Sequence, residues 1–281
     1  MPNETTAGSE KDFIKEYATP LSILGAGLLI AFGVYFALSG ASTSTGGQKT
    51  ATAEITLRGV QPDDHIRGSA DAPIIMVEFS DTECPFCKSF DATARSVIEK
   101  YGADGKVAWV YRHFPIPTLH SKAQKEGEAL ECAAEQGGNE GFWAYSDALY
   151  STTKSNNSLD IGVYNTGNQP QGSLDAGQLS DFAAQTGLDK TAFEQCLASG
   201  KHAERVERDT IEAGEAGGQG TPYIVFISKG RVPSETRELL DSLIPSVGPN
   251  TFAISKDGKR ISMSGALPFT IVDQLLATLL K

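Results

Sequence analysis

Apolar and polar positions change their spacing along the chain, and the changes outline a fold. Mostly apolar runs predict buried strands at 73–79 and 106–114. From His120 to about Ala216 apolar residues recur every three to four positions, which predicts a block of helices. Further strands and a final helix are expected at 223–228, 251–255, 260–263 and 268–280. Strands that flank a helical block in this order indicate an α/β domain with a helical insertion.

Shorter segments complete this outline. A first strand is expected at 53–58, and the polar stretch 151–172 is expected to be a long loop. Helices are expected at 88–100, 175–186, 189–198 and 202–216.

An uncharged apolar run at 21–38 stands near the start of the chain. Its length is at the lower end of what a membrane-spanning helix needs. A cleaved signal peptide is the alternative, because residues 37–39 resemble a small-residue cleavage site. A signal peptide has a short basic leader, whereas about twenty mostly polar residues come first here. We therefore expect an uncleaved membrane anchor. The chain would then consist of a short cytoplasmic tail at 1–17, a transmembrane helix at 18–38, a flexible linker at 39–55 and a domain at 56–281. The helical insertion of this domain is expected at about 118–216.

The sequence Cys84-Pro-Phe-Cys87 stands between the apolar run 73–79 and the amphipathic segment 88–100. At a strand-to-helix junction the first sulfur meets free backbone N–H groups and the positive end of the helix dipole, which favour a thiolate. Thiolates attack disulfides, so the motif predicts a redox dithiol. Half of a zinc site is the alternative, but the other two cysteines lie far apart in the sequence and the four histidines are scattered.

The charges on either side of the apolar run give a weak indication of how the predicted transmembrane helix is oriented. Lys11 and Lys15 lie close before the apolar run, whereas Lys49 and Arg58 follow at a greater distance, which favours an N-terminus inside the cell. Stable disulfide chemistry also belongs outside the cytosol. We expect a single-pass protein of the cell membrane with its large domain on the extracytoplasmic side. The net charge of −11 argues against nucleic acid as a partner.

Five motifs occur in an order that resembles the DsbA-like thiol–disulfide oxidoreductases. The resemblance covers roughly residues 56–281 and rests on Val77-Glu-Phe-Ser-Asp81, Cys84-Pro-Phe-Cys87, Arg112-His-Phe-Pro115 with His120, Cys132-Ala-Ala-Glu-Gln-Gly137 with Phe142-Trp143, and Gly220-Thr-Pro222. It implies a thioredoxin fold interrupted by a helical domain.

The resemblance also implies roles at the matching positions. Cys84 would be the exposed nucleophile and Cys87 the buried resolving thiol. Pro222 would be a cis-proline that faces them, and Thr221 beside it would contact an extended substrate. Glu78 would be a buried acid that moves protons at Cys87.

Other positions carry further expectations. Pro85 and Phe86 are expected to bind the substrate together with Thr221, and they would tune the redox potential through the stability of the Cys84 thiolate. Relatives with cysteines in the segments of Cys132 and Cys196 suggest a structural disulfide there; two free core thiols are the alternative.

Two points stay open at this stage. Glu78 could face solvent at a sheet edge, in which case Asp81 or Glu83 would serve as the acid. The segment 232–250, with Ser234 able to cap a short helix to about Leu243, departs from the family pattern. It could lie near the dithiol and alter substrate choice, or it could be surface decoration.

The predicted function is the introduction of disulfides into extracytoplasmic proteins through Cys84 and Cys87, without a metal or other cofactor. Reduced or unfolded proteins would be the substrates. A quinone-linked membrane oxidase of the DsbB or vitamin K epoxide reductase type would restore the disulfide, by analogy only. The alternatives are a disulfide reductase or isomerase, and a surface chaperone in which this pair is a structural disulfide.

Overall fold

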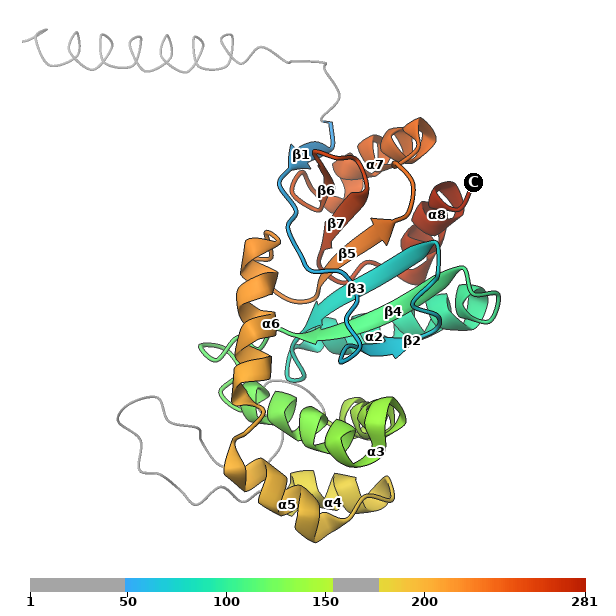
Figure 1. Cartoon of the computed structure of the whole chain (residues 1–281). Coiled ribbons are helices and arrows are strands. Elements are labelled where there is room, and N and C mark those ends of the chain that lie inside the picture. The colour runs from blue at the N-terminus through green and yellow to red at the C-terminus, as the bar shows by residue number, and fades with distance from the viewer. Residues whose placement is uncertain (1–48, 154–176) are drawn as a thin grey trace, which may run out of the picture. The chain divides into compact units, whose positions relative to one another are not determined.

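The computed structural model describes residues 49–153 and 177–281 (Figure 1). In this part of the chain seven strands form one sheet, in the order β1-β6-β7-β5-β3-β4-β2. Their bounds are β1 Ala51–Ala53, β2 His65–Arg67, β3 Ile74–Ser80, β4 Val107–His113, β5 Tyr223–Ser228, β6 Phe252–Ser255 and β7 Arg260–Ser264. The α-helices of the same ranges are α2 Pro85–Val97, α3 Ala123–Thr152, α4 Gly177–Gln185, α5 Lys190–Ser199, α6 Ala203–Glu215, α7 Ser234–Val247 and α8 Phe269–Leu279.

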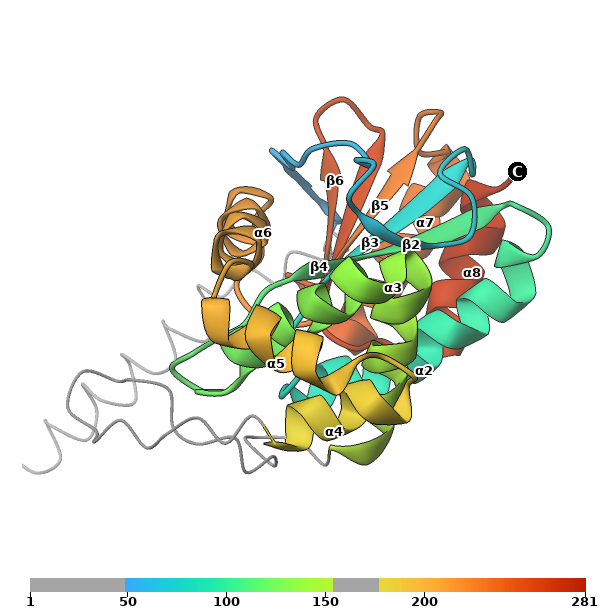
Figure 2. The same cartoon turned by 60° about the horizontal axis from the view of Figure 1, so that its bottom comes forward.

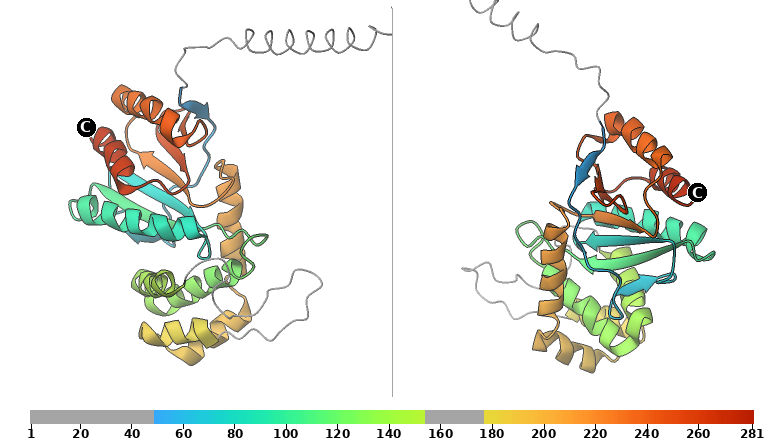
Figure 3. Two further views of the ribbon diagram at one scale, coloured as in Figure 1. Left: turned by 180° about the vertical axis from the view of Figure 1, so that it is seen from behind. Right: turned by 45° about the horizontal axis from the view of Figure 1, so that its top comes forward.

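Strand β3 is an inner strand of the sheet, between β5 and β4, and it is buried on both faces. It pairs in parallel with β4 and antiparallel with β5. Its alternate residues Ile74 and Met76 join the core that contains residues of α2 and α8, whereas Val77 and Phe79 join a second core that contains Ala213 of α6. In the view from behind, α2, α7 and α8 cover one face of the sheet (Figure 3).

Helices α3 to α6 lie between β4 and β5 in the sequence and form an inserted helical region. Helix α3 packs against α4, α5 and α6, and Figure 2 shows α3, α4 and α5 grouped beside the sheet. Within α3 the helix is broken at Gly138, whose φ of 61° and ψ of −152° suit a residue without a Cβ. Helix α6 then returns the chain to the sheet, where it contacts β4 and β3. The architecture is therefore an α/β thioredoxin fold with a helical insertion.

The predictions at the start of the domain were partly wrong. The first strand lies at Ala51–Ala53 and pairs in parallel with β6, so it falls inside the segment expected to be a flexible linker. Residues 54–60 belong to no strand, although Ile55 and Leu57 are buried. The alternation of buried and more exposed residues at 54–58 therefore comes from an extended segment that buries one side but does not pair with a strand. Strand β2 was missed because its three residues carry no apolar pattern.

The segment 232–250 contains helix α7, which is four residues longer than expected at its C-terminal end. Helix α7 packs on α8, and its Asp241 accepts hydrogen bonds from Thr50.

Among the described residues, no helix combines the length and apolar character that crossing a membrane requires. The tail at 1–17, the anchor at 18–38 and most of the loop at 151–172 lie outside the described residues, and they stay predictions.

Candidate active site

Cys84 lies at the turn between β3 and α2, immediately before the first helical residue. Its backbone is extended (φ −74°, ψ 123°), and its N–H donates to the carbonyl of Asp81 at 3.1 Å. Pro85 is the first residue of the helix, where the missing N–H of proline leaves no bond unmade. The N–H groups of Phe86 and Cys87 in this first turn hydrogen-bond to the sulfur of Cys84, which favours a negative charge there.

The surroundings of Cys84 lower the pKa of its thiol to about 5. Hydrogen bonding by the Cys87 thiol is the largest cause, and burial opposes it. The side chain of Thr221 and the N–H groups of Cys87 and Phe86 add to the lowering. At neutral pH Cys84 in the reduced protein is therefore a thiolate.

Cys84 is less exposed than the family resemblance implies. The residue is only 5% exposed, because its sulfur lies 3.4 Å from the carbonyl oxygen of Thr221. Cys87 is fully buried, so Cys84 is still the more accessible of the two. Phe86, between them, is 63% exposed and marks the open side of the dithiol.

The loop before β5 faces the dithiol with a cis peptide bond between Thr221 and Pro222. The carbonyl of Pro222 accepts from the N–H of Gly265 at 2.9 Å, which ties this loop to the end of β7. Thr221 thereby presents its backbone to Cys84.

Cys87 differs from Cys84 in its electrostatics. Burial raises the pKa of the Cys87 thiol well above its usual value, and the nearby Cys84 adds to the rise. The N–H of Asp81 donates to the Cys87 sulfur at 3.4 Å. The pair is therefore asymmetric, with one stabilised thiolate and one thiol that keeps its proton.

Glu78 lies on the face of β3 that carries Met76, and it is only 1% exposed. The solvent-facing alternative for this residue is wrong. Burial raises the pKa of Glu78 to about 8. The Ser80 hydroxyl donates to one carboxyl oxygen at 2.7 Å, and Trp109 Nε1 donates to the other at 2.9 Å. The hydroxyls of Ser80 and Tyr150 are 3.1 Å apart. Glu78 thus belongs to a buried proton-carrying network beside Cys87.

The carboxylate of Asp81 joins two segments of the chain, a role that the sequence did not predict. One carboxyl oxygen accepts from the N–H of Glu83 at 2.8 Å, and the other accepts from the N–H of Ile116 at 2.8 Å and contacts His120 Nδ1 at 2.9 Å. Asp81 therefore fastens the turn ahead of Cys84 to the segment that leads into the insertion. The only sequence signal for this role is the position of Asp81, two residues after the strand predicted at 73–79.

Glu83, the other alternative acid, is buried near a second carboxyl group. Glu126 of α3 is fully buried as well, and its pKa is raised well above the usual value by burial and then by Glu83. No signal in the sequence brings these two residues together.

A disulfide joins Cys132 of α3 to Cys196 of α5, with an S–S distance of 2.04 Å. It lies in the insertion and cross-links two of its helices.

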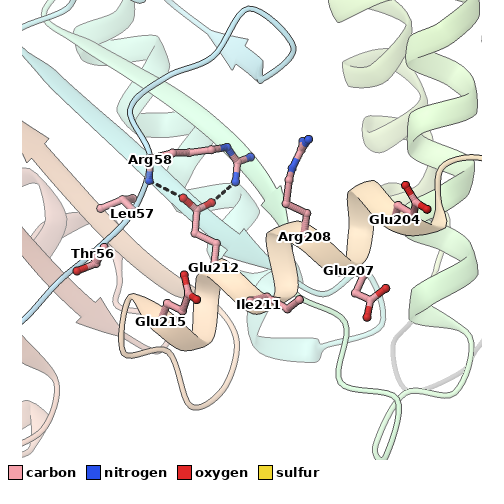
Figure 4. A pocket seen from close by; sticks show the side chains of 9 residues that line it. All are labelled: Thr56, Leu57, Arg58, Glu204, Glu207, Arg208, Ile211, Glu212 and Glu215. Atoms are coloured by element: carbon pink, nitrogen blue, oxygen red, sulfur yellow. Dashed lines mark hydrogen bonds and ion pairs between the residues drawn. The ribbon is translucent and has the colours of Figure 1, made fainter.

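Two cavities differ in their relation to the dithiol. One, of about 690 Å³, is lined by Thr221 and Gly220 together with residues of β1, β6 and β7. The other, of about 450 Å³, lies between residues 56–58 and α6, and no residue of the dithiol lines it (Figure 4). There Arg58 forms hydrogen bonds to Glu212. Neither cysteine lines these two cavities, but the first reaches Thr221, whose carbonyl oxygen contacts Cys84.

A thioredoxin family profile matches residues 60–244, which is more than half of the chain. The chain belongs to the DsbA-like thioredoxin family. Its members exchange thiols and disulfides, and DsbA-like proteins act on protein substrates.

Solved structures of this family share the fold. DsbA2 of Pseudomonas aeruginosa is 22% identical, with a TM-score of 0.52 over 77% of this chain and 94% of that one. BdbD of Bacillus subtilis, in its oxidised form, is 16% identical, with a TM-score of 0.55 over 83% of this chain and 98% of that one. These identities support the fold and no finer conclusion.

Curated relatives include much longer proteins. The Na(+)/H(+) antiporter NhaA 3 of Salinispora tropica is 33% identical over 61% of this chain and 22% of its own length. NhaA 1 of Salinispora arenicola is 28% identical over 72% of this chain and 27% of its own length. The chain thus spans about a quarter of the curated relatives it matches.

For this DsbA-like protein, the variant Glu78→Gln is expected to slow reduction of the Cys84–Cys87 disulfide by a dithiol about 100-fold below pH 8. Glu78 is protonated there and can supply a proton to the departing Cys87 sulfur through Ser80. The wild-type rate, corrected for substrate thiolate, should fall as pH rises through about 8, whereas the variant rate should stay level. Stopped-flow tryptophan fluorescence measures both rates. If the rates of the two proteins depend on pH in the same way, Glu78 does not supply the proton.

A second readout separates this role from a merely structural one. Glu78 ionises near pH 4.5 in the unfolded chain but keeps its proton up to about pH 8 in the folded protein, so the fold loses stability as pH rises from about 4.5 to about 8. Glu78→Gln should therefore be more stable than wild type at pH 7, by up to about 3 kcal/mol. A slower but more stable variant cannot owe its slow rate to a damaged fold.

Proposed function

We propose that this protein introduces disulfides into other proteins through Cys84 and Cys87. One observation carries the proposal: the pKa of Cys84 is lowered to about 5 while that of Cys87 is raised. A stabilised Cys84 thiolate favours the reduced dithiol over the disulfide, which makes the disulfide oxidising. An oxidising disulfide oxidises the ordinary thiols of a substrate to a disulfide and is itself reduced.

The reaction begins with the Cys84–Cys87 disulfide. A substrate thiolate attacks the Cys84 sulfur, a bond forms between the two sulfurs, and the Cys84–Cys87 bond breaks. The Cys87 sulfur leaves and takes a proton from Glu78 by way of Ser80. A second substrate thiolate then attacks the substrate sulfur, and Cys84 leaves as a thiolate. Two electrons have moved from the substrate to the enzyme, and the substrate holds a new disulfide.

The cis-proline loop and the open side of the dithiol are the proposed place for the substrate. The backbone of Thr221 lies against Cys84, so an extended chain that reaches Cys84 also meets this backbone. Phe86 offers an exposed apolar ring beside Pro85. The cavity of about 690 Å³ begins at Thr221 and leaves room for residues that flank the reacting cysteine.

We further propose that residues 18–38 anchor the protein in the cell membrane, with the catalytic domain on the extracytoplasmic side. The apolar run and the charges around it support this topology. A quinone-linked oxidase of the DsbB or vitamin K epoxide reductase type would re-oxidise the dithiol, and the anchor would keep both proteins in one membrane.

Equilibration of the protein with reduced and oxidised glutathione tests the direction of electron flow. We expect a reduction potential between about −120 and −200 mV, as for oxidants of this chemistry. A value near −270 mV, the range of thioredoxin, would instead support the reductase alternative. The fraction of alkylated cysteine, measured by mass spectrometry across the buffer series, gives the potential.

A further inference from the structure

Four side chains gather at one end of the inserted helical region, where α3, α5 and the start of α6 meet. The sulfurs of Cys132 and Cys196 and a ring nitrogen of His202 all lie within 4.8 Å of one another. Glu135, one turn beyond Cys132, places its Oε2 atom 2.9 Å from His202 Nε2 and 3.8 Å from the Cys196 sulfur. The catalytic cycle proposed above uses none of these residues.

The donor set is that of a metal site once the disulfide is open. Two thiolates, one imidazole and one carboxylate are the ligand types that Zn²⁺ accepts in a tetrahedral site. The Cα atoms of Cys132 and Cys196 are 5.9 Å apart, so side-chain rotation alone can separate the two sulfurs and let both bind one ion.

We propose that reduction of the Cys132–Cys196 disulfide converts this cluster into a Zn²⁺ site with Cys132, Cys196, His202 and Glu135 as ligands. A dithiol supplies the two electrons and two protons that turn the disulfide into two thiols, and it is itself oxidised to a disulfide. Zn²⁺ then displaces the two thiol protons.

Burial and charge at the cluster suit such an ion. Cys132 and Cys196 are almost fully buried, whereas the side chains of His202 and Glu135 are 22% and 42% exposed. The ion can therefore enter from the side of the last two residues. Lys201 donates to Oε1 of Glu135 at 2.6 Å, so Oε2, the oxygen that faces His202 and Cys196, is the one placed for the metal.

The disulfide and the metal would be alternative cross-links of the same helices. The disulfide joins α3 to α5. The metal would join both to the first residue ahead of α6, and it would hold the insertion together in molecules whose disulfide has not yet formed. Bound Zn²⁺ would also shield the two sulfurs from oxidation.

Cobalt binding to the full chain in detergent tests the site. In the background Cys84→Ser, Cys87→Ser only Cys132 and Cys196 remain as cysteines. After reduction with a phosphine and its removal, Co²⁺ should give a thiolate-to-cobalt charge-transfer band and the visible spectrum of a tetrahedral site. Zn²⁺ should abolish both. The unreduced protein should give neither.

Two variants in this background decide which side chains bind. His202→Ala should weaken Co²⁺ binding at least about tenfold, since even groups that only support a ligand contribute that much. Lys201→Ala is the matched control: it removes a neighbour that is no ligand and frees Glu135, so binding should persist or tighten. Equal affinity in the His202→Ala protein would overturn the proposal. Loss of the helical circular dichroism on reduction would also overturn it, because the ligands meet only in the folded insertion.

The rate of disulfide formation provides an independent measurement. Zn²⁺ should slow the re-oxidation of Cys132 and Cys196 by oxidised glutathione at least about tenfold, and His202→Ala should remove most of this protection. A rate unaffected by Zn²⁺ would contradict a site that includes both sulfurs.

Discussion

Replacing Cys84 with serine is expected to abolish catalysed oxidation of a reduced peptide. A serine hydroxyl forms no disulfide, and Cys87 cannot replace it because that sulfur is fully buried with a raised pKa. The rate should therefore fall to that of the redox buffer alone. Formation of the peptide disulfide, followed by chromatography in a glutathione buffer, measures it. Unfolding by urea should show little loss of stability relative to the wild-type protein with its Cys84–Cys87 disulfide formed.

Cys87→Ser is the matched control, since it removes the other half of the pair. Cys84 then keeps its place at the N-terminus of α2 and can still form a mixed disulfide with a substrate. The resolving sulfur is gone, so mixed disulfides should accumulate and appear on non-reducing gels. A Cys84→Ser protein that retains activity would rule out the proposed nucleophile. A protein that mainly loses stability would favour the surface-chaperone alternative, in which the pair is a structural disulfide.

The position of the dithiol could be predicted from sequence because it depends on local rules. An apolar run, a turn and an amphipathic helix with proline at its first position leave one arrangement for Cys84. The burial of Glu78 stayed open at that stage, because alternation alone does not show that both faces of β3 are covered. Period-two alternation could, however, have shown that Ser80 shares the face of Glu78.

Features that depend on contacts between segments far apart in the sequence could not be predicted. Strand β1 forms because β6, some two hundred positions later, offers it an edge, and nothing in Ala51–Ala53 signals this. The low exposure of Cys84 results from the loop that carries Thr221. The contact of Asp81 with Ile116 and His120 likewise joins segments that the sequence keeps apart.

Replacing Arg112 with methionine is expected to destabilise the protein by about 3–5 kcal/mol. Arg112 lies in β4 and is fully buried. Its guanidinium makes two bonds to the carboxylate of Asp64, at 2.8 and 3.1 Å, and one to Glu212 of α6 at 3.2 Å. It also donates to the carbonyls of Arg58 and Gly59. Methionine fills similar space but leaves the buried Asp64 without its main partner. Urea unfolding followed by circular dichroism measures the loss.

Arg208→Met is the matched control, because the same residue type is lost from the same acidic surroundings. Arg208 is half exposed, contacts Asp63 at 3.3 Å and lies 3.7 Å from Asp209, so its removal should cost at most about 1 kcal/mol. The dithiol lies outside this network, so the reduction potential of folded Arg112→Met should match that of wild type. If the two variants lose equal stability, the buried network does not hold residues 58–64 and α6 to the sheet, and the apolar contacts of Ile55, Leu57 and Ala213 must hold them there.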